Sequence, residues 1–118
     1  MKIVFDLEGA LLDVTGGLDH NVAGTYWRKH DEGHTIEVWS DRPIEQAGDL
    51  MSFFSDNDLP VPDLFRMRAA DCNLSENMMK EQWLLESILD GCAPTLVYEG
   101  RELLANMYTY HGTRVAVL

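Results

Sequence analysis

The chain has 118 residues, of which 46% are hydrophobic, and a formal net charge of −11. This length and apolar content are typical of one compact domain, so we expect a single domain over residues 1–118 and exclude intrinsic disorder. Twenty acidic side chains against nine basic ones disfavour general adhesion to nucleic acids or anionic membranes, because affinity for polyphosphates depends mainly on Lys and Arg. A local basic pocket for short ends or small nucleotides is compatible with this charge.

The cysteine content and the lack of long apolar runs indicate a cytoplasmic protein. Cys72 and Cys92 have no CxxC spacing, and two cysteines are too few for a disulfide framework or a structural zinc site. No charged and then apolar leader opens the chain, and no apolar run approaches the roughly 20 residues that span a bilayer. We therefore expect no membrane contact, while a homo-oligomeric assembly is left open.

The first half of the chain predicts two strands, each followed by a helix. Residues 2–6, KIVFD, form a short apolar run that ends in an acid and predicts a buried strand, and the glycine of a turn follows. Residues 18–30 predict an irregular helix. Residues 35–39, TIEVW, are β-branched and aromatic and predict a second strand. Residues 40–43 resemble a helix start, after which apolar residues recur at helical spacing to about residue 56.

The second half continues the alternation. Strands are predicted at residues 64–67, 94–98 and 114–118, and helices at residues 75–91 and 101–110, with Ser75 as a cap and Gly91 as an end signal. Alternating strands and helices without hairpin signals predict a doubly wound, Rossmann-like parallel sheet of five strands, with helices on both faces and the first strand central. Ligands bind beyond the carboxyl ends of the strands in such sheets, so the residues that follow each strand are the candidate site.

Two carboxylates follow the first strand. Asp6 ends the strand, and Glu8 stands two positions later, before Gly9. One carboxylate there could attack phosphorus while the second protonates the leaving oxygen, and together they offer the oxygen ligands that suit Mg²⁺. The alternative is a polar strand end with a solvated turn.

Three further side chains stand at the equivalent edge. Ser40 closes the second strand and could bind a phosphate oxygen, or it could act as an ordinary helix cap. Lys80 lies near the start of an amphipathic helix, where it either reaches over the sheet edge or is a common exposed lysine. Glu99 follows the fourth strand and could complete a metal site or cap the next helix.

Four arginines are also expected near this edge, and their role has two interpretations. They stand near the predicted ligand side at Arg42, Arg66, Arg68 and Arg101. They could form a basic pocket, or they could simply pair with the abundant acids, and exposed ion pairs stabilise little.

The order of these motifs resembles the phosphatase half of bacteriophage-type polynucleotide kinase/phosphatases, within the haloacid-dehalogenase-like (HAD) superfamily. The matching segments are DLEGALLD (beside the family's DxDGTLxD), VWSDRP, FRMRAAD followed by KEQWLLESIL, and LVYEGRELLANMY. The similarity runs from Lys2 to Leu118 and is least between Val14 and Gly33. No large cap insertion is present, as in open-site members that accept large substrates.

The resemblance implies a magnesium-dependent phosphomonoesterase that acts on a nucleotide or on the phosphorylated end of a nucleic acid. Asp6 would be the nucleophile, and Glu8 would be the general acid and base. The phosphoryl group would be bound by Ser40, Lys80 and Arg42, and Mg²⁺ by Asp6, Glu8 and Glu99.

Three departures from the family pattern fall within these motifs. Glu8 replaces the second Asp, Ala10 replaces a Thr, and Gly100 replaces the second member of an acidic pair. Longer and fewer carboxylates weaken a site for Mg²⁺, which demands near-ideal octahedral geometry. A catalytically inactive HAD-like protein with a binding or regulatory role is therefore the alternative function.

Overall fold

The structure, a computed structural model, describes residues 1–116 and contains one five-stranded parallel sheet. The strands are β1 (Lys2–Asp6), β2 (Thr35–Pro43), β3 (Leu64–Arg68), β4 (Leu96–Tyr98) and β5 (Val115–Ala116). Their order is β3-β2-β1-β4-β5, so the first strand is central, as predicted. The predicted fifth strand extends to residue 118, and its positions 117 and 118 lie outside the described residues.

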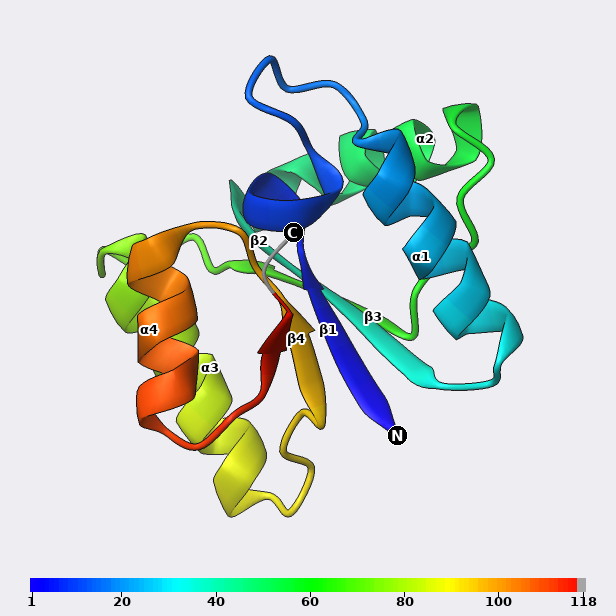
Figure 1. The fold of residues 1–118 in the computed structure, drawn as a ribbon. Coiled ribbons are helices and arrows are strands. Elements are labelled where there is room, and N and C mark those ends of the chain that lie inside the picture. The colour runs from blue at the N-terminus through cyan, green and yellow to red at the C-terminus, as the bar shows by residue number, and fades with distance from the viewer. Residues whose placement is uncertain (117–118) are drawn as a thin grey trace.

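Helices cover both faces of the sheet, which confirms the predicted doubly wound, Rossmann-like α/β class. The helices are α1 (His20–Asp31), α2 (Ala47–Asp56), α3 (Glu76–Leu89) and α4 (Glu102–Tyr110), with a π turn η1 (Leu7–Leu11) and a 3-10 turn η2 (Ile44–Gln46). Helices α1 and α2 lie on one face, and α3 and α4 lie on the other (Figure 1). Residues 1–116 contain no large cap, since their longest connection is residues 12–19. None of the described helices is long and apolar enough to cross a membrane.

Helix α1 is regular, so the predicted irregularity is wrong. The carboxylate of Asp19 accepts hydrogen bonds from the backbone N–H groups of Asn21 and Val22, which are otherwise without helical partners. Val22, Ala23 and Tyr26 then form one buried face. A good cap and a continuous apolar face therefore stabilise the helix despite the glycine within it.

The predicted helix start at Ser40 is also wrong, because β2 continues to Pro43. The amide of Asp41 donates to the Glu8 carboxylate, and the amide of Arg42 donates to the Ser40 hydroxyl. Side chains therefore satisfy backbone groups that a helix would otherwise bond, and the chain stays extended. The helical segment begins only at Ile44.

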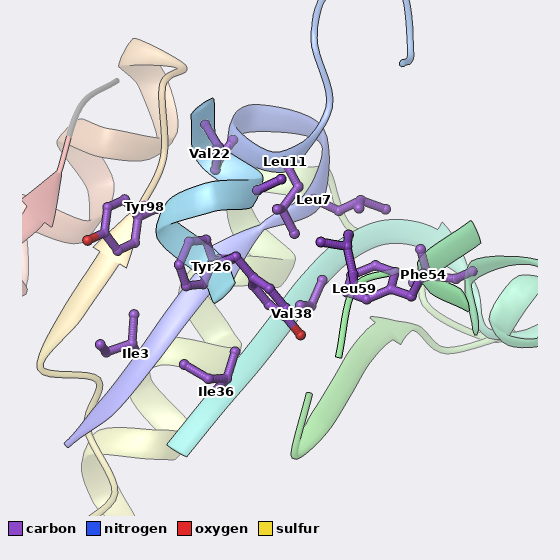
Figure 2. Packing of buried hydrophobic residues seen from close by; sticks show 14 of the residues in the cluster. Ile3, Leu7, Leu11, Val22, Tyr26, Ile36, Val38, Phe54, Leu59 and Tyr98 are labelled. Carbon is purple, nitrogen blue, oxygen red and sulfur yellow. The ribbon is translucent and has the colours of Figure 1, made fainter. Parts of the chain in front are cut away.

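The central strand is buried on both sides because its side chains alternate between two cores. Ile3 and Phe5 face α1 and α2, and Figure 2 shows this core with Tyr26 and Tyr98 beside the strand. Val4 faces α3 and α4. The same alternation directs Asp6, the last residue of β1, toward the α3 side, which is where the candidate site forms.

We expect Phe5→Ala to lower the free energy of unfolding by about 3–5 kcal/mol, because it leaves a cavity between stacked rings. The Phe5 ring is fully buried, stacks on Tyr98 at 4.5 Å between centroids and meets Tyr26 edge-on at 5.1 Å. Urea denaturation measures the change. Leu89→Ala is the control, since Leu89 is 86% exposed and its truncation is expected to change stability by less than about 0.5 kcal/mol.

Candidate functional site

A buried ion pair lies at the carboxyl end of the central strand. The Nζ atom of Lys80 on α3 is 2.5 Å from Oδ2 of Asp6, and both side chains are fully buried. Lys80 is therefore not the exposed helix lysine that was the alternative from the sequence. Burial by itself would lower the pKa of Lys80, but the charge of Asp6 and hydrogen bonds to Asp6 and Glu76 raise it above its usual value. Lys80 is thus a permanent cation inside the domain.

Glu8 joins this pair to the neighbouring strand. It lies in the π turn directly after β1, a rare backbone geometry that is frequent at functional sites. The Glu8 carboxylate accepts hydrogen bonds from the Ser40 hydroxyl at 2.9 Å and from the Asp41 amide at 2.7 Å. Its Oε1 is 3.9 Å from Lys80 Nζ. Burial raises the pKa of Glu8, and the nearby Asp6 charge adds to this, so Glu8 holds a proton more readily than an exposed glutamate.

Arg42 lies at the rim of the cluster. Its Nε atom is 4.0 Å from Oε2 of Glu8, and its side chain is about two-fifths exposed. The structure therefore brings Arg42 near Glu8. Of the other arginines expected at this edge, Arg101 lies in the cluster and Arg66 pairs with Glu86 outside it. Arg68 binds Asp41 and the carbonyl oxygens of Cys72 and Leu74.

Glu99 is buried after β4 and is held by Arg101. Its Oε1 accepts from the Arg101 amide at 2.9 Å and from Arg101 Nε at 3.2 Å. The carboxylate lies across Gly9, because a Cβ at position 9 would be 1.7 Å from Glu99 Oε1. Burial, and then the negative charge of Asp6, raise the pKa of Glu99 to about 7, while Arg101 partly opposes this. Only glycine at position 9 permits this arrangement.

Glu76 and the bridging role of Arg101 were not predicted from the sequence. Glu76, in the first turn of α3, accepts from Lys80 at 2.7 Å and from two Arg101 nitrogens at 2.9 and 2.7 Å. Burial alone would raise the pKa of Glu76, but hydrogen bonds from Arg101 and Lys80 hold it below its usual value. The only sequence signal was the i, i+4 spacing between Glu76 and Lys80, which places both on one helix face.

Three carboxylates converge closely enough to bind a metal ion. Oxygens of Asp6, Glu8 and Glu76 all lie within 4.8 Å of one another. This group includes Glu76, which the sequence did not suggest, and does not include Glu99. Carboxylate oxygens are the donors that hard divalent cations prefer. Four carboxylates face three cations, Lys80, Arg101 and the partly exposed Arg42, so the cluster has an excess of at most one negative charge. The donor set fits one divalent cation.

The cavity beside the cluster reaches only part of it. It has a volume of about 420 Å³ and is lined by Glu8, Gly9, Ala10, Leu12, Asp13, Val14, Asp19, Gly100 and Arg101. Five candidate site residues were named from the sequence, namely Asp6, Glu8, Ser40, Lys80 and Glu99, and of these Glu8 lines the cavity. Asp6, Ser40, Lys80 and Glu99 are fully buried behind its wall. The predicted convergence is therefore observed as contacts, while direct access is limited to Glu8 and Arg101.

Gly100 has a packing reason to be glycine. Its amide donates to the carbonyl oxygen of Gly9 at 2.8 Å, and a Cβ at position 100 would lie 2.9 Å from that same oxygen. The turn after β1 and the turn after β4 therefore touch through their backbones. An aspartate at position 100, as in the family pattern, would require one of these turns to move.

Comparisons with known proteins show the fold. No protein-family model and no curated protein matches the chain. The solved structures it resembles include a chain of the Pnkp1/Rnl/Hen1 RNA repair complex, with a TM-score of 0.87 and 18% identity, covering 99% of this chain and 42% of that one. A second structure of the Pnkp1/Rnl/Hen1 complex gives a TM-score of 0.86 and 19% identity, covering 99% and 45%. The chain therefore has a fold found in RNA repair complexes and spans less than half the length of the chains it matches.

We expect Glu99→Gln to remove a pH dependence of stability. A folded-state pKa of about 7, against a usual value of 4.5, means that folding favours protonated Glu99. This contribution is full below about pH 4.5 and is lost as the pH rises through 7, a change of up to about 3 kcal/mol. Urea denaturation at pH 5, 6, 7 and 8 should show wild-type stability falling relative to Glu99→Gln. Glu102→Gln, at an exposed position, is the matched control. If the free energy of unfolding changes with pH equally in wild type and Glu99→Gln, the pKa of Glu99 is not raised by folding.

Proposed function

We propose that residues 1–118 form a single HAD-type domain that hydrolyses phosphomonoesters of nucleotides or phosphorylated nucleic-acid ends. The observation that carries the proposal is the buried Asp6–Lys80 pair at the end of the central strand, with Glu8 two residues later and Ser40 on the next strand. The likeness to chains of an RNA repair complex supports a substrate with a nucleic-acid phosphate.

The proposed chemistry assigns one task to each group. An Asp6 oxygen attacks phosphorus to form an aspartyl-phosphate, and the bond to the leaving oxygen breaks while Glu8 gives that oxygen its proton. Glu8 then takes a proton from the water that hydrolyses the intermediate, which releases phosphate and restores Asp6. Burial raises the pKa of Glu8, which favours the protonated form that the first step needs.

The remaining residues would bind the phosphoryl group and stabilise its negative charge. Lys80 and Ser40 would bind its oxygens, and Arg42 at the rim would meet the substrate as it arrives, since positioning and electrostatics carry most phosphoryl-transfer catalysis. Mg²⁺ held by Asp6, Glu8 and Glu76 would neutralise further negative charge there. Glu99 was the third carboxylate in our expectation for the metal and stays a candidate ligand, since Arg101 bonds Asp6 and Glu76 as well as Glu99.

A second candidate function is phosphate binding without turnover. Both oxygens of Asp6 are already engaged, Oδ1 by the Gly9 amide and Arg101, and Oδ2 by Lys80. Asp6 is also fully buried, so attack requires a rearrangement that opens it to the substrate. These contacts favour a binding protein if that rearrangement does not occur.

A phosphatase assay with Mg²⁺ or Mn²⁺ tests the proposal over nucleoside monophosphates and oligonucleotides phosphorylated at either end. We expect slow hydrolysis by wild type and a loss of at least about 10³-fold in Asp6→Asn, because removing a nucleophile costs at least this much. Arg66→Gln is the control, since Arg66 binds Glu86 away from the cluster. Unchanged turnover in Asp6→Asn would rule out Asp6 as the nucleophile. Phosphate binding by an inert wild type would establish the second candidate.

A further inference from the structure

The Arg101 guanidinium occupies the carboxylate cluster as a bound cation would. One of its terminal nitrogens, Nη2, is 2.9 Å from Oδ1 of Asp6 and 2.7 Å from Oε2 of Glu76. The other terminal nitrogen is 2.9 Å from Oε1 of Glu76. Burial would lower the pKa of Arg101, but its carboxylate partners raise it, so the guanidinium stays charged. Arg101 therefore occupies oxygens of two of the three carboxylates that could bind a divalent cation, Asp6 and Glu76.

Both Lys80 and Arg101 bridge Asp6 and Glu76, and the two side chains differ in their exposure to solvent. Lys80 also contacts Asp6 and Glu76, but its side chain is fully buried below them. Arg101 is 37% exposed at its side chain and lies in the wall of the 420 Å³ cavity, next to Gly100. Arg101 is the cation that can move into the cavity without opening the core.

The lone pairs of the ligand oxygens limit how many partners bind at once. Oε2 of Glu76 already accepts from both Lys80 and Arg101, and Oδ1 of Asp6 accepts from the Gly9 amide and Arg101. A metal ion at these oxygens needs the positions that Arg101 holds. Movement of Arg101 out of the cluster also removes one positive charge, so the remaining carboxylates attract a divalent cation more strongly.

We propose that Arg101 is the displaceable counter-ion of Asp6 and Glu76, and that Arg101 and a divalent cation bind these two carboxylates in mutually exclusive fashion. The inference deepens the proposed function, since it names what controls metal entry at that same site. Glu99 is a positioning residue in this scheme, because its bonds to the amide and Nε of Arg101 aim the guanidinium at Asp6 and Glu76. Displacement of Arg101 also frees Oδ1 of Asp6.

The test measures metal binding in the full 118-residue chain without substrate. Mn²⁺ is titrated into wild type, Arg101→Gln and Arg66→Gln, with free Mn²⁺ followed by electron paramagnetic resonance. We expect Arg101→Gln to bind Mn²⁺ at least about tenfold more tightly than wild type, the change that one charge-assisted hydrogen bond represents. Arg66→Gln loses the same charge outside the cluster and should bind like wild type. Adding Glu76→Gln to Arg101→Gln should abolish the gain.

Thermal unfolding with and without Mn²⁺ gives a second readout. Mn²⁺ should raise the Tm of Arg101→Gln more than that of wild type, because a ligand stabilises the state that binds it. If Arg101→Gln does not fold, Arg101→Lys decides, since an ammonium with three donors cannot reproduce all the bonds that the guanidinium makes to Asp6, Glu76 and Glu99. Tighter Mn²⁺ binding by Arg101→Lys than by wild type supports the proposal. Equal or weaker Mn²⁺ binding by the folded variant overturns it. The outcome is independent of phosphatase activity, so failure of either proposal is seen separately.

Discussion

The site depends on one buried pair of opposite charges, Asp6 and Lys80. Neither group reaches solvent, so each would be strongly destabilised alone in this interior. Removing one partner of such a pair commonly costs about 3–5 kcal/mol, because it leaves a buried charge without compensation. The pair therefore ties the end of β1 to α3, and the surrounding residues are arranged to balance its charge: Glu76 for Lys80, and Arg101 for Asp6.

Most of the fold could be predicted from the sequence because a central parallel strand leaves a clear pattern. Residues 2–6 are apolar throughout since both faces of β1 are buried, and the order of strands and helices then determines the layers. Two details could not be predicted. The length of β2 depends on Glu8 and Ser40 capturing backbone amides, and the regularity of α1 depends on how Asp19 caps it. Both are interactions that spacing does not reveal.

The positions of the candidate site residues along the chain could be predicted, but which side chains bond to one another could not. Asp6, Glu8 and Ser40 converge because parallel strands end at one edge, and Lys80 reaches them from helix α3. The direction of the Arg101 side chain depends instead on its bond to Glu99, whose carboxylate lies across Gly9. Acidic composition makes an arginine pair with some carboxylate, but it does not determine which one.

The backbone contact between Gly9 and Gly100 has a consequence for how this sequence can change over generations. A side chain at position 100 meets the carbonyl of Gly9, and a side chain at position 9 meets the carboxylate of Glu99. A side chain at position 100 requires the turn after β1 to shift, and one at position 9 requires the Glu99 side chain to move, so the effects of changes at the two positions will not add. An acidic side chain at position 100 therefore requires a compensating change in the turn after β1, and evolution of this edge of the sheet proceeds through paired substitutions.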